Sequence, residues 1–287
     1  MSLPSAVPAS SSGADTFYGA PAGRRVTMRD LAEASRRGER WPMITAYDAM
    51  TAAVFDEAGI PALLVGDSAA MVVFGHDSTL PVTVTELLPL VKAVVRGSHR
   101  SLVIADLPFG SYQASPAQAL ETAAAFMKEG GAQAVKLEGG ASVLPQVEAL
   151  ASAGIPVIGH LGLTPQSVNL FGGYRVQGRG ESGDLLMRDA KALEAAGAAA
   201  MVLEVVPADL AARVTEIVSI PTIGIGAGPG TNAQVIVWQD LVGLGAGPAP
   251  RFVKRYADMR TVLGEAVRAW SDDVVSGAYP AEEHTYR

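Results

Sequence analysis

The chain has 287 residues and a formal net charge of −7, because 29 Asp and Glu residues outnumber 22 Lys and Arg residues. This balance argues against a protein that binds nucleic acid through a basic surface. No cysteine is present, which excludes disulfide bonds, thiolate zinc sites, iron–sulfur clusters and a cysteine nucleophile. Hydrophobic residues make up 49% of the chain, so we expect a substantial buried core.

The first 22 residues are rich in Ser, Ala, Pro and Gly, and they lack the basic start and apolar run of a signal peptide. We expect residues 1–22 to form a flexible N-terminal arm, outside a single catalytic domain of residues 23–287. Acids such as Asp67 and Glu204 interrupt the most hydrophobic stretches, so no membrane-spanning run is predicted. The expectation is a cytoplasmic protein without membrane contact.

Short runs of branched apolar residues recur after helical stretches that end in Gly, often through an Ile-Pro step. Glycine supplies the left-handed conformation at a helix end, and proline is tolerated as the first residue of a strand. The pattern predicts eight strands, near residues 43–47, 62–67, 102–107, 134–138, 156–160, 200–204, 221–225 and 235–239. It also predicts helices over 116–129, 182–196, 208–218 and, in the C-terminal tail, 259–275.

Eight strand and helix units in about 250 residues favour an α/β fold of the (β/α)8 TIM-barrel type, with an additional C-terminal helix. The apolar runs are mostly continuous, as expected for parallel strands that are buried on both faces. A doubly wound open sheet is the alternative. Catalytic groups of barrel enzymes lie at the C-terminal ends of the strands, so the residues that end each run are candidates.

Acidic residues end most of the predicted strands. Asp67, Asp106 and Glu138 end the second, third and fourth, and such carboxylates would repel one another unless a cation lay among them. Oxygen ligands without cysteine favour a hard ion such as Mg²⁺. Any single strand-end acid could instead cap the next helix, and for Asp48 we favour capping over metal binding.

Three further polar residues lie at or near strand ends. Lys136 shares a face of its strand with Glu138, and it could bind a substrate carboxylate or form a structural ion pair. His160 has small neighbours and could be catalytic or structural. Glu204 ends an apolar run, which suits a general base that works near neutral pH, with an ion pair to Lys or Arg as the alternative.

Two glycine-rich segments, 224–229 and 243–248, do not match the G-x-G-x-x-G pattern of dinucleotide-binding loops. In a barrel, the loops after the seventh and eighth strands often bind phosphate, but tight turns explain the glycines equally well. The G-x-S-x-G motif of serine hydrolases is also absent, so the sequence does not support hydrolysis through a serine triad.

Several longer strings are more specific: VGDS at 65–68, GHDSTLPVT at 75–83, VKLEGG at 135–140 and GHLGLTPQSVNLFGGYRVQGR at 159–179. Together with ADLPF at 105–109 and GAYPAEEH at 277–284, they resemble the ketopantoate hydroxymethyltransferase family from about residue 25 to the end of the chain. One departure is Ala69-Ala70, where Leu-Gly is commoner in the family. This difference removes no functional group.

The resemblance implies a barrel of the phosphoenolpyruvate/pyruvate superfamily. It implies transfer of a hydroxymethyl group from 5,10-methylenetetrahydrofolate to 3-methyl-2-oxobutanoate, the committed step towards pantothenate. It further implies a homo-oligomer, since bacterial relatives form decamers built from dimers. Residues 172–180 are a plausible wall or lid beside the pterin, by position alone.

The resemblance also assigns roles to the strand-end residues. Asp67, Asp106 and Glu138 would surround Mg²⁺, directly or through water, and the keto acid would chelate this ion. Glu204 would be the catalytic general base. The residues implied in substrate binding are Asp67, Ser68, Asp106, Lys136 and His160.

Two rival functions remain. A carbon–carbon lyase of the same superfamily would also need Mg²⁺ and a 2-oxo acid, but its isocitrate-lyase-like branch uses a catalytic cysteine, which this chain lacks. A non-catalytic metabolite-binding protein on a decayed barrel is the second rival. Decay should first remove buried acids that are costly to keep, yet Asp67, Asp106, Glu138 and Glu204 are all present.

Overall fold

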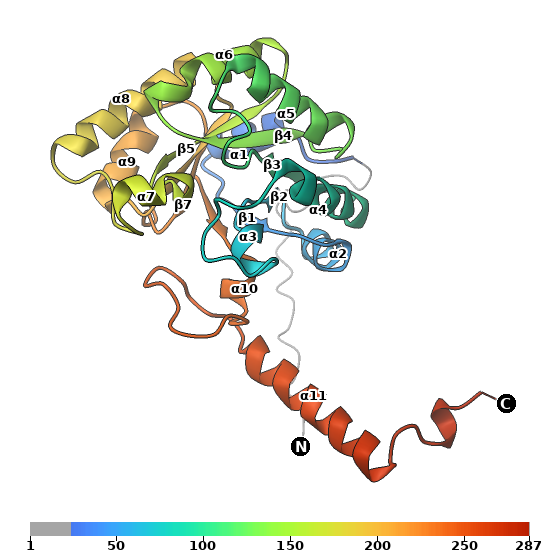
Figure 1. Ribbon diagram of the computed structural model, residues 1–287. Coiled ribbons are helices and arrows are strands. Elements are labelled where there is room, and N and C mark those ends of the chain that lie inside the picture. The colour runs from blue at the N-terminus through green and yellow to red at the C-terminus, as the bar shows by residue number, and fades with distance from the viewer. Residues whose placement is uncertain (1–23, 287) are drawn as a thin grey trace.

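The computed structural model describes residues 24–286, so the predicted arm of residues 1–22 lies outside the described part of the chain. Eight parallel strands close into a barrel in chain order, and β8 pairs with β1. Helices surround the barrel (Figure 1). The fold is therefore the predicted (β/α)8 barrel, and closure rules out the open doubly wound sheet.

The strands lie close to the predicted ranges. They are β1 (Trp41–Thr45), β2 (Ala62–Val65), β3 (Leu102–Asp106), β4 (Ala134–Glu138), β5 (Val157–Gly162), β6 (Ala200–Glu204), β7 (Thr222–Ile225) and β8 (Ala233–Ile236). The poorest match is β8, predicted over 235–239. It ends at Ile236 because Val237 is already the N-cap of a short helix and the Trp238 N–H donates to Thr45 Oγ1 at 3.1 Å.

The helices are α1 (Met28–Arg36), α2 (Ala49–Glu57), α3 (Ala69–Val72), α4 (Val84–Gly97), α5 (Pro116–Lys128), α6 (Leu144–Ser152), α7 (Val168–Phe171), α8 (Glu181–Ala195), α9 (Ala208–Ile217), α10 (Trp238–Leu241) and α11 (Met259–Ser276). The predicted C-terminal helix is α11, which extends away from the barrel (Figure 1). Residues 226–232 join β7 to β8 without a helix. Across residues 24–286, none of the helices has the length and apolar character needed to cross a membrane.

Side-chain caps fix where several helices begin. Asp48 caps α2, because its Oδ1 accepts hydrogen bonds from the N–H groups of Met50 and Thr51, each at 2.9 Å. The capping role predicted for Asp48 is thus confirmed. Ser115 caps α5 in the same way by accepting from the Gln118 N–H at 3.1 Å.

The apolar core has an outer and an inner part. The outer part lies between the strands and the helices and includes Leu87, Phe126 and Leu137. The inner part fills the barrel with alternate strand residues, including Met43, Leu64, Ile104, Ile158, Val202 and Ile223. Because each strand alternates its faces, the residues that end the strands on the inner face lie above this filling, at one mouth of the barrel.

The buried carboxylate of Asp56 ties α2 to the segment that precedes β3. It accepts hydrogen bonds from the backbone N–H groups of His99 at 2.9 Å, Arg100 at 3.0 Å and Ser101 at 2.6 Å, and from the Ser101 hydroxyl at 2.6 Å. Burial raises the pKa of Asp56, but the hydrogen bonds together outweigh burial and hold the pKa below its ordinary value.

Asp56→Asn should therefore lower the free energy of unfolding by roughly 2 kcal/mol, because an amide has one acceptor oxygen instead of two. The folded pKa of Asp56 lies below the unfolded value of about 3.9, so its stabilisation is complete above about pH 4 and is lost as the pH falls through the folded pKa. Urea unfolding across acidic pH should show the difference between the two proteins shrinking. Asp48→Asn is the control, because Asn caps helices as well as Asp does. A difference that stayed constant down to low pH would contradict this account.

Candidate active site

A cavity of about 440 Å³ opens at the C-terminal ends of the strands. It lies where barrel enzymes carry their catalytic groups. Its lining contains every site residue predicted from the sequence: Asp67, Ser68, Asp106, Lys136, Glu138, His160 and Glu204. The structure thus brings these side chains together, and their individual roles stay predictions.

The strand ends position these side chains. Asp106, Glu138 and Glu204 are the last residues of β3, β4 and β6. Lys136 lies two residues before Glu138, so both side chains project from the same face of β4. Asp67 follows β2 in the loop that leads into α3.

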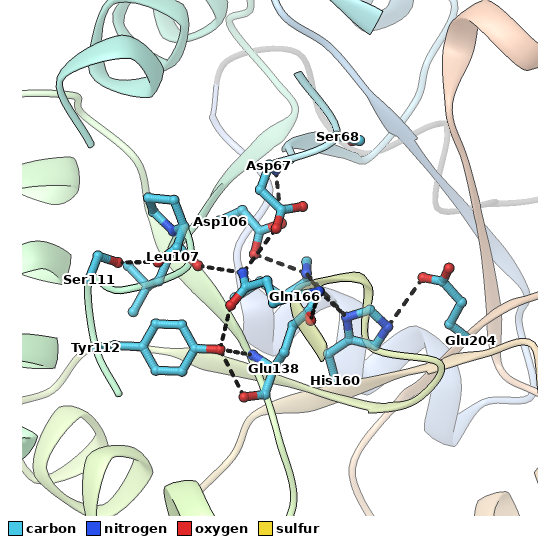
Figure 2. A network of polar contacts seen from close by, with 12 residues as sticks. Asp67, Ser68, Asp106, Leu107, Ser111, Tyr112, Glu138, His160, Gln166 and Glu204 are labelled. Carbon is cyan, nitrogen blue, oxygen red and sulfur yellow. Dashed lines mark hydrogen bonds and ion pairs between the residues drawn. The ribbon is translucent and has the colours of Figure 1, made fainter. Parts of the chain in front are cut away.

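Asp67 and Asp106 form a buried acidic pair (Figure 2). The Asp67 N–H donates to Asp106 Oδ2 at 3.1 Å. Burial, followed by repulsion from Asp106 and Glu138, raises the pKa of Asp67 well above its ordinary value. Burial also raises the pKa of Asp106, although the Lys136 ammonium opposes this effect. The pair therefore lacks enough positive charge nearby to keep both carboxylates ionised at ordinary pKa values.

The Lys136 ammonium lies in the middle of the cluster. Its Nζ is 2.9 Å from Asp106 Oδ1, 3.9 Å from Glu138 Oε1 and 3.3 Å from His160 Nδ1. Burial lowers the pKa of Lys136, but the carboxylates of Asp106 and Glu138 outweigh burial and raise the pKa above its ordinary value. Lys136 is therefore charged and forms the structural ion pair that was one of its two predicted roles.

His160 lies between two carboxylates (Figure 2). Its Nδ1 is 3.3 Å from Glu138 Oε1, and its Nε2 is 3.2 Å from Glu204 Oε2. Burial and the Lys136 charge lower the pKa of His160, but contacts with Glu138 and Glu204 outweigh both and raise it to about 9. The imidazole is therefore protonated near neutral pH.

The surroundings of Glu204 differ from the expected ones. The sequence suggests a carboxylate within an apolar run, or one paired with Lys or Arg. Glu204 instead ends β6 at the cavity, with 18% of its side chain exposed and the His160 ring as its charged partner. Leu203 packs in the outer core because successive strand residues alternate between faces, whereas Val202 and Val205 line the same cavity as Glu204.

The four carboxylates of Asp67, Asp106, Glu138 and Glu204 face two cations, Lys136 and the His160 imidazolium. The cluster with all four ionised thus carries a net charge of 2 − 4, or −2. Asp106 Oδ1 and Glu138 Oε1 also lack a well-aligned hydrogen bond. Such oxygens suit a hard divalent cation. Within residues 24–286, however, no three acidic or histidine side chains converge into a ready metal cage.

Gln166 and Tyr112 belong to the site and were not predicted. The Gln166 side-chain amide donates to Asp67 Oδ2 at 2.9 Å and to the Leu107 carbonyl at 3.0 Å, while its backbone N–H donates to Glu138 Oε2 at 3.0 Å. The Tyr112 hydroxyl lies 2.8 Å from Gln166 Oε1. Gln166 thus fixes two acids of the cluster relative to each other (Figure 2).

Val205, the residue after Glu204, has a strained backbone with φ at +48°. This left-handed conformation is an outlier for a β-branched residue. Two hydrogen bonds maintain it: the Val205 N–H donates to the Ile225 carbonyl at 2.8 Å, and the Val205 carbonyl accepts from the Gln177 N–H at 3.0 Å. The two hydrogen bonds thus hold the strained backbone in place and fix the direction in which the chain leaves Glu204.

Comparisons with known proteins identify the family. The model of the ketopantoate hydroxymethyltransferase family matches residues 25–282. A Frankia alni protein named 3-methyl-2-oxobutanoate hydroxymethyltransferase is 66% identical over 97% of this chain and 94% of its own length. The protein of the same name from Thermobifida fusca is 63% identical over 95% of this chain and 98% of its own length.

Similar folds occur among solved structures. Phosphonopyruvate hydrolase in complex with oxalate and Mg²⁺ has a TM-score of 0.59 at 12% identity, over 90% of this chain and 93% of its own. A 2,3-dimethylmalate lyase has a TM-score of 0.57 at 16% identity, over 92% and 93%. These two structures support the barrel fold alone. The family match and the closely similar relatives show that the chain is an enzyme that belongs to the ketopantoate hydroxymethyltransferase family.

Proposed function

We propose that the protein transfers a hydroxymethyl group from 5,10-methylenetetrahydrofolate to 3-methyl-2-oxobutanoate, giving 2-dehydropantoate and tetrahydrofolate. The family match and the names of the relatives support this reaction in pantothenate synthesis. One observation carries the mechanism: His160 divides the cavity. The acidic pair and Lys136 lie on one side of the imidazole ring, and Glu204 lies on the other side.

The acidic pair is suited to hold Mg²⁺. We assign Asp67 and Asp106 as direct ligands, because they are adjacent and buried, and ionising both would leave the cluster with two excess negative charges. Glu138 would act through water, since it contacts Lys136 and His160. Mg²⁺ usually binds one or two carboxylates and keeps its other positions for water and substrate oxygens. When bound, it would polarise the keto group and stabilise the developing negative charge by several kcal/mol.

The protein's own residues would bind and orient the keto acid. The Lys136 ammonium and the Ser68 hydroxyl offer donors to the substrate's oxygens, and Ser68 is held by the Tyr47 hydroxyl at 2.8 Å. Glu204 accepts the proton from C3 of the keto acid. The His160 imidazolium lies 3.2 Å from Glu204 Oε2 and fixes the direction of this carboxylate.

The transfer uses the keto acid, the folate and one water molecule. The C3 carbanion, delocalised into the keto group, bonds to the methylene carbon of the folate. The two bonds from this carbon to the folate nitrogens break in turn, and water supplies the hydroxyl oxygen. The C3 proton and the remaining water proton end on the two nitrogens.

Glu204→Gln should slow exchange of the C3 proton with D2O by at least about 100-fold, because the amide cannot accept the proton. Proton NMR of 3-methyl-2-oxobutanoate with Mg²⁺ and without folate measures this step alone. Binding of the keto acid should be retained. Glu148→Gln, an exposed position on α6, is the matched control. Unchanged exchange in Glu204→Gln would remove Glu204 from the role of base.

Asp106→Asn should weaken Mg²⁺ and keto acid binding together, by more than about tenfold each. Isothermal titration with and without EDTA measures both affinities, and circular dichroism checks the fold. Asp209→Asn, exposed on α9, is the control. Keto acid affinity that persisted in EDTA would show that the metal does not bridge substrate and protein.

We also propose a homo-oligomer, a decamer by likeness to the family. The support in this chain is α11, an 18-residue helix with no buried residue and a row of exposed apolar side chains, including Val262, Val267, Trp270 and Val274. A single chain leaves these side chains in water, whereas contact with another copy would bury them.

Val267→Glu should therefore lower the mass measured by light scattering after size-exclusion chromatography, because a charge would enter a contact between copies. Arg268→Gln, one position along the same helix, is the control and should keep the mass of the unchanged protein. If the protein without substitutions eluted as a monomer, this result would contradict the proposed assembly.

A further inference from the structure

The motif GHDSTLPVT at residues 75–83 has no part in the proposed mechanism. It forms most of the connection between α3 and α4, which belongs to the same barrel loop as Asp67 and Ser68. Residues 75–77 are exposed, whereas Thr79 is only 2% exposed and lines the active-site cavity. The motif therefore brings one buried hydroxyl group to the mouth of the barrel.

Two anchors hold the segment that carries Thr79. On one side, the His76 N–H donates to the Ala70 carbonyl at 2.9 Å and ties the segment to α3. On the other side, Thr83 caps α4, because its hydroxyl accepts a hydrogen bond from the Glu86 N–H at 3.3 Å. Thr79 is thus held at the cavity between two fixed points.

The Thr79 hydroxyl differs from the other polar groups of the cavity. Within residues 24–286, Thr79 Oγ1 has no hydrogen-bond partner. Asp106 Oδ1, Glu138 Oε1 and His160 Nε2 also lack a well-aligned hydrogen bond, but each takes part in an ion pair. In this part of the chain, Thr79 Oγ1 has neither kind of partner. A buried polar group without a partner destabilises a folded protein, so a ligand in the cavity is the group that would compensate for it.

The barrel geometry indicates which part of a keto acid would lie beside Thr79. Because β2 and β6 are four strands apart in either direction around the closed barrel, the loop after β2 faces the end of β6 across the cavity. Glu204 ends β6, and in the proposed reaction C3 of the keto acid lies beside this base. The carboxylate carbon is separated from C3 by the keto carbon. The carboxylate is therefore directed away from Glu204, towards Ser68 and Thr79.

We propose that the Thr79 hydroxyl donates a hydrogen bond to the carboxylate of the keto acid, an inference that rests on the proposed function. A carboxylate has about four lone-pair sites, so it can accept from Thr79 in addition to Lys136 and Ser68. A neutral hydroxyl suits this place better than a further cation, because another cation would neutralise Asp67 and Asp106 and compete with Mg²⁺. Thr79 thus binds and orients the substrate and moves no proton.

Thr79→Val should change stability and affinity in opposite directions, because it keeps the shape of the side chain and removes the hydroxyl. Without keto acid, the melting temperature should rise by roughly 2–4 °C, since a buried group without a partner is lost. Isothermal titration of the full-length protein, with saturating Mg²⁺ and without folate, measures the affinity. The Kd for 3-methyl-2-oxobutanoate should rise by about tenfold, as expected for the loss of one hydrogen bond to a charged group.

Exchange of the C3 proton with D2O separates binding from catalysis in the same variant. The keto acid concentration that gives half of the maximal exchange rate should rise together with the Kd. The maximal rate should be unchanged, because Glu204 still accepts the proton once the keto acid is bound.

Two further variants make the test specific to the hydroxyl. Thr79→Ser retains this group and should restore most of the affinity. Thr222→Val is the matched control, because Thr222 is buried at the start of β7, at the opposite end of the barrel, and its hydroxyl lies 2.7 Å from Thr215 Oγ1. This control should lower the melting temperature and leave the Kd unchanged.

An unchanged Kd in Thr79→Val would overturn the proposal. So would a Thr79→Ser variant that binds as weakly as Thr79→Val, because shape and not the hydroxyl would then determine affinity. Weaker binding together with a lower melting temperature in Thr79→Val would assign the hydroxyl a structural role and also overturn the proposal. Failure of the proposed function has a different signature: the protein without substitutions neither exchanges the C3 proton nor yields 2-dehydropantoate.

Discussion

The active site depends on one buried ammonium group. Lys136 compensates the carboxylates that end two adjacent strands, β3 and β4, in an interior where uncompensated charges of one sign would repel strongly. The same ion pair joins Asp106 to β4, so the charge balance of the site and the packing of the barrel mouth are maintained by a single contact. Lys136 is also held in place, because it cannot leave the cluster without exposing buried carboxylates to one another.

Lys136 and His160 lie side by side in the cavity, 3.3 Å apart, and carboxylates surround both. Glu138 lies within 4 Å of the ammonium and of the imidazolium, and Glu204 contacts the other nitrogen of the imidazolium. His160 thus separates a side that is rich in acids from a side with a single carboxylate. A metal-binding acid pair and a base can therefore occupy one cavity without direct contact between their carboxylates.

Much of this architecture could be predicted because the sequence marks the ends of its elements. The glycines and Ile-Pro steps locate most strands, and the rule that barrels carry chemistry at strand ends selects Asp106, Glu138 and Glu204. The partner of Glu204 was beyond prediction, since it depends on the register that sets His160 opposite Val202. Gln166, in a single 3-10 turn after β5, was missed because a neutral amide has no charge or spacing that reveals its contact with Asp67, which is 99 residues away in the sequence.

The strained backbone of Val205 has a consequence for engineering. A left-handed residue costs about 1–3 kcal/mol, and glycine would adopt the same conformation without that cost. Selection for thermal stability alone would thus favour a more permissive residue beside Glu204. A more permissive residue would also loosen the backbone that fixes the direction of the Glu204 carboxylate. Stability and activity therefore place opposite demands on this position. Stabilising designs of this barrel should leave the turn after β6 unchanged.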